Sequence, residues 1–198
     1  MRLVTVLTLV CVMAALVLGA VYKNTAPLIA AQKEKETQQA LKQALPDADK
    51  FIIQRVNGEA YYEGYKDGKL IGYVITVKAE GYTGDIEIMV GLDKKGVITG
   101  VEILTQQETP GLGARCIEVK YGEKTPWFAR QFKQKKAEEI SLENIETITG
   151  ATITTEAIID AIKESVDNWG QVLNLEKFGG DSISETIRNY KAYIKNLT

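Results

Sequence analysis

The sequence predicts an α+β protein with a single N-terminal transmembrane helix followed by one domain, an antiparallel sheet flanked by helices. Three observations support this prediction. Residues 3–21 form an apolar run without a charge, residues 51–107 contain short β-rich runs separated by turn residues, and apolar residues recur at helical spacing after residue 156. With 198 residues and 45 % hydrophobic content, the chain can form one core besides the membrane segment.

The apolar run 3–21 is about 19 residues long and, at about 1.5 Å per residue, spans about 28 Å, which matches the hydrocarbon core of a bilayer. Residues 1–24 are therefore predicted to be a transmembrane anchor. A cleaved signal peptide is the alternative, because Arg2 precedes the run and small residues follow it. Basic residues lie on both sides of the run, so the positive-inside rule does not decide the orientation.

Residues 25–49 are predicted to be a helical spacer, in which a helix runs from Leu28 to Leu45 and is polar in its middle. Pro46 ends this helix, because proline lacks the N–H that would continue it. The folded domain is expected over residues 50–175. Residues 176–198 are predicted to be a helical tail with an apolar stripe.

Two β-hairpins are predicted in the first half of the domain. Runs 61–65 and 69–78 flank Asp67-Gly68, and runs 86–92 and 97–105 flank a turn that ends at Gly96. Four antiparallel strands follow from these hairpins. In the fourth strand, alternation puts Thr99 and Val101 on one face and Ile98 on the other, and the mixed pattern predicts a sheet partly covered on both sides.

A helix start is predicted after the sheet, at Thr125-Pro126, with the threonine as N-cap and the proline at the first helical position. The aromatic residues that follow, Trp127, Phe128 and Phe132, are predicted to be core contacts, because buried aromatics usually serve packing.

Composition argues against several classes of function. The net charge of −2, with lysines and arginines interspersed among acids, argues against nucleic-acid binding. The chain has no histidine, which excludes Ser-His and Cys-His dyads and histidine-ligated metals. Cys11 and Cys116 are too few for a disulfide framework or a cysteine-only metal site. No catalytic side chain and no metal are expected, and redox chemistry would require an organic cofactor.

The segment 146–155 is predicted to join a strand to a helix. Ile145 and Ile148 favour an extended strand, and Gly150 allows a sharp turn with positive φ. The helix is marked by Ile158, Ile162, Val166 and Trp169. Thr152 is thereby placed at a helix N-terminus, where unpaired N–H groups and the helix dipole stabilise a phosphate. The alternative is that Thr152 serves only as the N-cap of that helix.

The motif Glu146-x-x-Thr149-Gly150-Ala151-Thr152 resembles the flavinylation motif of the FMN-binding domain found in the G subunit of Rnf complexes and in the C subunit of sodium-pumping quinone reductases. In that family the last threonine carries FMN through a phosphoester bond. The resemblance implies that Thr152 is the attachment point and that Thr149, Gly150 and Ala151 form the turn that presents it. Thr154 is a further cofactor-binding candidate. The family usually has aspartate where this chain has Glu146.

A second part of the resemblance is the loop Glu108-Thr109-Pro110-Gly111-Leu112-Gly113, which follows Gly81-Tyr82-Thr83-Gly84 as it does in the Rnf G subunit. Glycines allow backbone to approach a flat ring, so this loop is the candidate site for the flavin ring. Leu112 can pack on the ring, and backbone groups of Thr109 and Gly111 can bond its polar edge. The candidates here are Glu108, Thr109, Gly111, Leu112, Gly113 and Tyr82.

The resemblance implies a membrane-anchored protein that relays electrons through covalent FMN in an Rnf-type ferredoxin:NAD⁺ oxidoreductase coupled to ion translocation. Its partners would be the other membrane and iron–sulfur subunits, and its domain would face the extracytoplasmic side. One alternative is the C subunit of a sodium-translocating NADH:quinone reductase, for which the chain is short. Another is a stand-alone extracytoplasmic flavin carrier. An alternative of a different class is a membrane-tethered interaction module without a cofactor.

Overall fold

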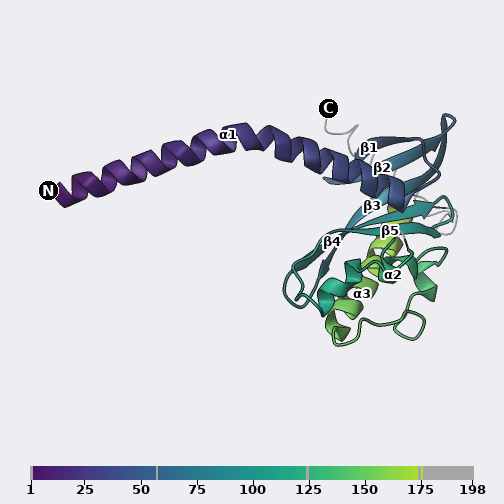
Figure 1. Cartoon of the computed structure of the whole chain (residues 1–198). Coiled ribbons are helices and arrows are strands. Elements are labelled where there is room, and N and C mark those ends of the chain that lie inside the picture. The colour runs from purple at the N-terminus through teal and green to yellow at the C-terminus, as the bar shows by residue number, and fades with distance from the viewer. Residues whose placement is uncertain (1, 57, 124, 174, 176–198) are drawn as a thin grey trace, which may run out of the picture. The chain divides into compact units, whose positions relative to one another are not determined.

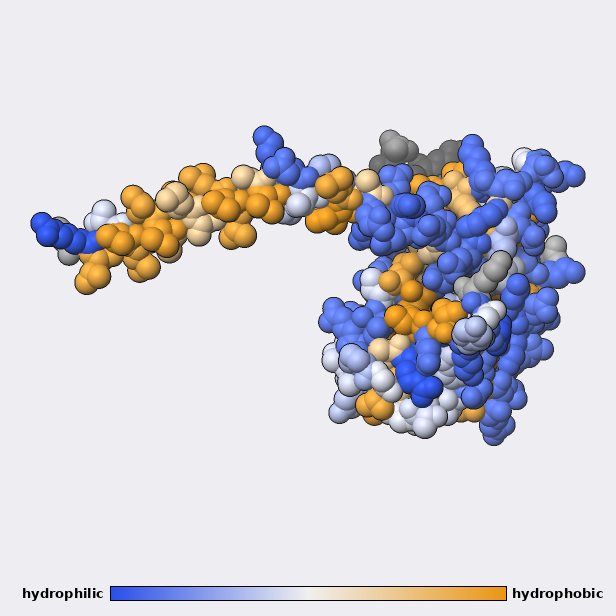
Figure 2. Space-filling model, viewed as in Figure 1, coloured by the Kyte–Doolittle hydropathy of each residue, from blue (hydrophilic) through white to orange (hydrophobic). Residues whose placement is uncertain are grey.

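The computed structural model describes residues 2–56, 58–123, 125–173 and 175, and the chain divides into two compact units, Met1–Gln39 and Ala40–Thr198 (Figure 1). The first unit consists of helix α1, which runs over Arg2–Ala44 and ends in the second unit. Within the described residues, α1 is the one helix long and apolar enough to cross a membrane. The side chains of its first half are exposed and mostly apolar (Figure 2).

Helix α1 is continuous through Pro27, so the predicted spacer does not start as a separate helix. One proline removes one N–H from a helix of 43 residues, and the backbone bonds of the neighbouring turns keep it intact. The helix ends at Ala44, just before Pro46, as predicted. The predicted helical tail, residues 176–198, lies outside the described residues.

Five strands form one antiparallel sheet in the order β1-β2-β3-β4-β5. The strands are β1 (Lys50–Val56), β2 (Glu59–Lys66), β3 (Lys69–Glu80), β4 (Asp85–Asp93) and β5 (Ile98–Thr105). Both predicted hairpins are present, with φ of 50° and 75° at Asp67 and Gly68 and 74° at Gly96. The prediction of four strands was wrong, because β1 pairs with β2 along its whole length. The dipeptide Asn57-Gly58 between them is itself a hairpin signal.

Strand β1 is the outer strand of the sheet, and most of its side chains are exposed on both faces. The other outer strand, β5, is bonded on its free side by a loop. The N–H of Ile98 donates to the carbonyl of Lys135 at 3.0 Å, and the N–H of Gln134 donates to the carbonyl of Ile98 at 2.7 Å. The two edges of the sheet therefore differ: β5 has backbone hydrogen bonds on its outer side, whereas β1 is largely exposed.

A β-bulge in β5 changes which residues share a face. Gly91 of β4 pairs with Gly100 and Leu92 pairs with Ile98, so Thr99 is an extra residue. Its hydroxyl donates to the carbonyl of Ala44 in α1 at 2.6 Å, whereas Ile98 packs in the core on the other face together with Val101. The prediction that Thr99 and Val101 share a face was wrong, because a bulge shifts the alternation by one residue.

Both faces of the sheet are covered, as the mixed pattern predicted. On one face, helix α3 (Thr152–Val172) packs on β3 with Ile158, Ile162, Val166 and Trp169 buried. The predicted aromatic core contacts Trp127, Phe128 and Phe132 are buried in the same cluster. On the other face, the last turn of α1 packs through Leu41 and Ala44 on Val74 and Met89.

Four glycines lie in neighbouring strands beneath the end of α1: Gly64, Gly72, Gly91 and Gly100. A Cβ added at Gly91 or Gly100 would run into the main-chain carbonyls at the end of α1, and one added at Gly64 would run into the Leu45 side chain. The end of the helix therefore lies directly on the backbone of the sheet. Ala40, Leu41 and Ala44 are buried against this face of the sheet, and they belong to the second compact unit.

Short elements connect β5 to α3. They are η1 (Gly113–Ile117), α2 (Trp127–Arg130) and η2 (Ala137–Glu139). Helix α2 has Pro126 rather than Thr125 as its cap residue, and no side chain caps it. The predicted threonine cap was wrong because the first-turn N–H of Trp127 already donates to the carbonyl of Glu118 at 3.2 Å.

Candidate functional site

The site lies at the start of α3, where a tight turn precedes the helix. Gly150 has φ of 78°, as predicted, and the N–H of Ala151 donates to the carbonyl of Ile148 at 2.9 Å. The helix begins at Thr152. The side chains of Thr152 and Ile153 are exposed, whereas those of Thr154 and Thr155 are buried.

The strand predicted before this turn is absent: residues 144–151 form turns and irregular backbone. Their backbone groups bond to side chains instead of a neighbouring strand. Gln131 accepts from the N–H of Glu146 at 2.7 Å and donates to its carbonyl at 3.2 Å. The N–H of Ile148 donates to the hydroxyl of Thr155 at 3.1 Å. The β-branched residues Ile145 and Ile148 are used as buried anchors of a loop.

Thr152 is the first residue of the helix and not its cap. The cap residue is Ala151, which offers no side-chain acceptor. Thr155 provides the local cap-like bonds, because its hydroxyl accepts from Ile148 and donates to the carbonyl of Ala151 at 3.0 Å. The hydroxyl of Thr152 is therefore not needed to cap the helix.

The loop 108–113 folds into a compact turn. The carbonyl of Thr109 accepts from the N–H groups of Leu112 at 3.1 Å and Ala114 at 3.3 Å, and Gly111 has φ of 80°. Gly113 lies against α3, because an added Cβ would meet the Thr154 hydroxyl at 2.7 Å. Leu112 lies against the other turn, because a Cβ added at Gly150 would meet its Cδ2 at 3.1 Å. Two segments far apart in the sequence are thereby in contact.

Between these segments lies a cavity of about 480 Å³. Its lining residues are Tyr82, Glu108, Thr109, Leu112, Gly113, Gly150, Ala151, Thr152, Ile153 and Thr154. The structure thus brings together nearly all the residues singled out from the two motifs. Gly111 and Thr149 do not line this cavity; Gly111 lines a shallow groove with Pro110 and Arg115 instead. Ile153 was missed, although its place next to Thr152 at a helix start is visible in the sequence.

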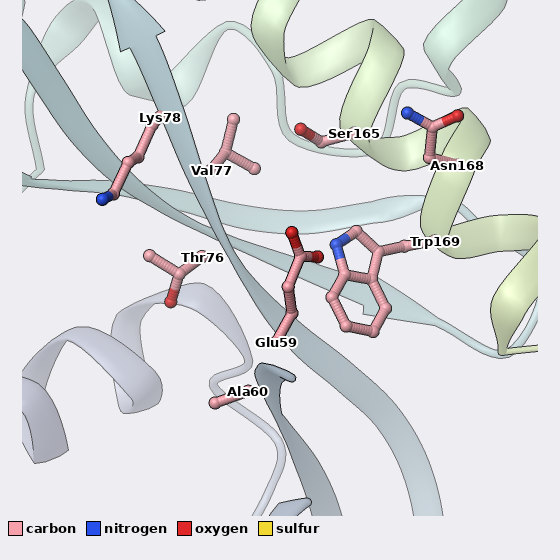
Figure 3. Close-up of a pocket in the computed structure, with 8 residues that line it drawn as sticks. All are labelled: Glu59, Ala60, Thr76, Val77, Lys78, Ser165, Asn168 and Trp169. Carbon is pink, nitrogen blue, oxygen red and sulfur yellow. The ribbon is translucent and has the colours of Figure 1, made fainter. Parts of the chain in front are cut away.

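A second cavity, of about 530 Å³, lies near the other end of α3 (Figure 3). It is lined by Glu59, Ala60, Thr76, Val77, Lys78, Ser165, Asn168 and Trp169. Ser165 is about 20 Å along the helix from Thr152. This cavity contains no helix N-terminus and none of the residues predicted to bind a cofactor, so it is separate from the candidate site.

The fold and the site together define an FMN-binding domain: residues 81–167 match that family, and every residue that lines the first cavity falls within this range. The chain is 36 % identical over 170 residues to the G subunit of the proton-translocating ferredoxin:NAD(+) oxidoreductase complex of Clostridium ljungdahlii, covering 81 % of this chain and 86 % of that relative. It is 28 % identical over 182 residues to the G subunit of the ion-translocating oxidoreductase complex of Methanosarcina acetivorans, covering 84 % and 92 %. The protein belongs to the G-subunit family of ion-translocating oxidoreductase complexes, which confirms the resemblance inferred from the motifs.

A solved structure with the same fold is the C subunit of the Na(+)-translocating NADH-quinone reductase from Parabacteroides distasonis. It has a TM-score of 0.53 and 19 % identity, and the match covers 78 % of this chain and 97 % of that chain. At this identity the likeness concerns the fold alone. It confirms the predicted α+β architecture.

The cavity suits a cofactor such as FMN. Exposed apolar side chains of Leu112 and Ile153 and the exposed ring of Tyr82 can contact a flat ring system. The first N–H groups of α3 have no acceptor within the helix and can bind a phosphate. Gly113 and Gly150 allow the two segments that line the cavity to pack closely, because a Cβ at Gly113 would meet the Thr154 hydroxyl at 2.7 Å and one at Gly150 would meet Leu112 Cδ2 at 3.1 Å.

Proposed function

We propose that the protein carries FMN as a phosphoester on Thr152 and works as an electron-transfer component of an Rnf-type ferredoxin:NAD⁺ oxidoreductase coupled to ion translocation. The observation that supports this most directly is the position of Thr152. Its exposed hydroxyl stands at the first residue of α3 and lines the cavity formed with the loop 108–113.

Thr152 is the best attachment point among the threonines of α3. Thr154 and Thr155 are 1 % and 0 % exposed. Their hydroxyls donate to Glu108 at 2.6 Å and to the carbonyl of Ala151 at 3.0 Å, respectively. An enzyme that transfers a flavin phosphate needs an accessible hydroxyl, and Thr152 offers one without disturbing the interior. Thr149 is also exposed but does not line the cavity.

The phosphate of the ester is stabilised by the backbone in this proposal. No lysine or arginine among the described residues lines the cavity, so the positive end of α3 and its free N–H groups supply the attraction. Ester formation joins Thr152 Oγ1 to the phosphorus, with loss of the hydroxyl proton and cleavage of one P–O bond of the donor. The protein gains the mass of one FMN less one water.

The loop 108–113 and the start of α3 hold the ring of the cofactor. Leu112 from the loop and Ile153 from α3 both line the cavity and are both exposed, so each can cover part of a flat ring. FMN supplies the electron-transfer chemistry when bound, and these residues determine its position and exposure. No side chain needs to act as an acid, base or nucleophile.

The anchor and the partners follow from the family. Helix α1 holds the protein in the membrane, and the other membrane and iron–sulfur subunits of such a complex are its partners. We place the domain on the extracytoplasmic side, as the family resemblance implies.

The test is to express the full chain with a flavin transferase and to measure intact mass and flavin fluorescence after denaturation. Wild type should be yellow and carry one FMN less one water, and Thr152→Ala should carry none. Thr152→Ser, which keeps a hydroxyl, should keep part of the adduct, and Thr125→Ala, which removes an exposed hydroxyl outside both motifs, should retain it fully. The Thr152→Ala domain should stay folded, because the substitution removes an exposed hydroxyl without a cap role, at a cost of about 0.5 kcal/mol or less.

Two outcomes would contradict the proposal. If Thr152→Ala still carries the adduct, another residue is the attachment point. If wild type is colourless and has its unmodified mass although the transferase is active on another substrate, the domain is better described as a cofactor-free interaction module.

A further inference from the structure

Glu108 is the one charged side chain that lines the cavity among the described residues, and it is 5 % exposed. Its two carboxyl oxygens have separate donors. Oε1 accepts from the N–H of Thr83 at 2.9 Å, and Oε2 accepts from the hydroxyl of Thr154 at 2.6 Å. Both oxygens act as acceptors, as those of an ionised carboxylate do. The side chain is therefore fixed from two sides.

The backbone around Glu108 is shaped to admit this carboxylate. A Cβ added at Gly81 would run into Oε1, and one added at Gly113 would run into Oε2. A Cβ at Gly81 would also meet the carbonyl of Gly84 at 2.9 Å, and one at Gly113 would also meet the Thr154 hydroxyl at 2.7 Å, so both glycines lie in closely packed backbone around the carboxylate. The carboxyl group is therefore a fixed part of the cavity wall, held in place by its hydrogen bonds and by the close packing around it.

The described residues provide no countercharge for Glu108. The two ion pairs found there join Arg115 to Glu118 and Arg130 to Glu123. The charge of Glu108 also affects the neighbouring thiol of Cys116. Burial, as the larger cause, and the negative charge of Glu108 raise the pKa of this thiol to about 11. An unpaired charge away from water acts on its surroundings more strongly than the same charge at the surface.

We propose that the charge of Glu108 lowers the reduction potential of the cofactor in this cavity. The inference rests on the proposed function, because it requires FMN at this site. Two-electron reduction with uptake of one proton adds one net negative charge to the flavin, and a fixed negative charge beside it raises the free energy of the reduced form more than that of the oxidised form. Glu108 therefore makes the protein a readier electron donor.

A purely structural role is the competing explanation, because Glu108 also holds α3 to the turn at Thr83. Glu108→Gln separates the two. The amide has the same shape, its oxygen can accept from Thr83, and its NH₂ can donate to the Thr154 hydroxyl. The variant removes the charge and keeps the bonds. Glu108→Asp does the reverse, because it keeps the charge and shortens the side chain.

The experiment is a spectroelectrochemical titration of the flavin in the full-length protein in detergent. Glu108→Gln should raise the ratio of reduced to oxidised flavin at a fixed potential at least tenfold, which is about 30 mV for a two-electron couple. Glu108→Asp should change this ratio less than Glu108→Gln does. Glu143→Gln, which removes an exposed charge from the same unit, should change it less than about twofold, because surface charges are screened.

The outcomes separate this inference from the proposed function. A flavin-loaded Glu108→Gln protein whose potential equals that of wild type would leave Glu108 with a structural role and overturn the inference alone. Loss of the adduct in Glu108→Gln but not in wild type would also overturn it, because Glu108 would then be needed for attachment. Wild type without flavin would overturn the proposed function and this inference with it.

Discussion

Three threonines at the start of α3 have different roles because their surroundings differ. Thr152 is exposed at the cavity, Thr154 donates to a buried carboxylate, and Thr155 bonds the loop before the helix. A hydroxyl that is buried and already bonded costs about 1–3 kcal/mol to remove, whereas an exposed one costs little. Thr152 can therefore be modified without loss of the hydrogen bonds that Thr154 and Thr155 make in the same turn of the helix.

Glu102 on β5 is a second carboxyl whose environment has a measurable consequence. Its Oε2 is buried and has no hydrogen-bond partner among the described residues. Burial raises the pKa of this carboxyl above its usual range. Because the folded state disfavours the charged form, this group contributes stability below its unfolded pKa, and the contribution is lost as the pH rises through the folded pKa.

We therefore expect Glu102→Gln to increase the free energy of unfolding at pH 8, where wild type must carry the buried charge. The difference should shrink as the pH falls and vanish near pH 4, at about the unfolded pKa. Urea unfolding of both proteins at pH 4, 6 and 8 measures this. A difference that does not depend on pH would show that burial of the charge is not what destabilises wild type.

At the scale of elements, the contact between α1 and the sheet depends on glycines. Gly91→Ala should destabilise the domain by about 1–3 kcal/mol or more, because the new methyl group would run into the Ala44 carbonyl and the Thr99 hydroxyl. Gly84→Ala is the matched control, since its Cβ would meet nothing closer than 3.5 Å. Equal unfolding midpoints in urea for the two variants would contradict the close contact.

The elements that depend on turn residues and on the spacing of nearby apolar residues could be predicted from the sequence. The hairpins at Asp67-Gly68 and Gly96 and the stripe of α3 were correct, because turn chemistry and helical spacing are local. The bulge at Thr99 and the missing strand at 145–148 could not be predicted in this way. Thr99 bonds to Ala44, and Glu146 bonds to Gln131, so both depend on partners distant in the sequence.

The candidate site was predictable in its residue types and less so in its geometry. The motifs indicated that the segments near Leu112 and Thr152 would meet, and a single cavity joins them. Local patterns could not show that Gly111 faces another groove, or that Thr154 bonds to Glu108. Which side of a loop faces a cavity depends on packing that the loop's own sequence does not contain.

At the scale of the whole molecule, the boundary of the folded unit can be tested by truncation. A fragment of residues 30–198 keeps the last turns of α1, whereas a fragment of residues 50–198 loses the buried residues Leu41, Ala44, Leu45 and Ala48. Burying one leucine side chain is worth about 1.5–3 kcal/mol. The shorter fragment should therefore be less stable by about 3 kcal/mol or more, or should fail to fold.

Circular dichroism and urea unfolding of the two fragments provide the measurement. The fragment of residues 30–198 should unfold in one cooperative transition, because it retains the cores on both faces of the sheet. If the fragment of residues 50–198 is equally stable, the end of α1 is dispensable and the domain starts near Lys50 after all.

The unequal edges of the sheet have a consequence for the isolated domain in solution. The outer side of β5 is bonded by residues 134–135, but no such backbone bond is found on the outer side of β1 among the described residues, and its Ile52 and Ile53 are exposed. Open backbone beside exposed isoleucines favours side-by-side association of copies, which Lys50 and Arg55 oppose through their charge. Concentrated preparations of the domain should therefore become turbid more readily as salt rises, because salt screens that repulsion.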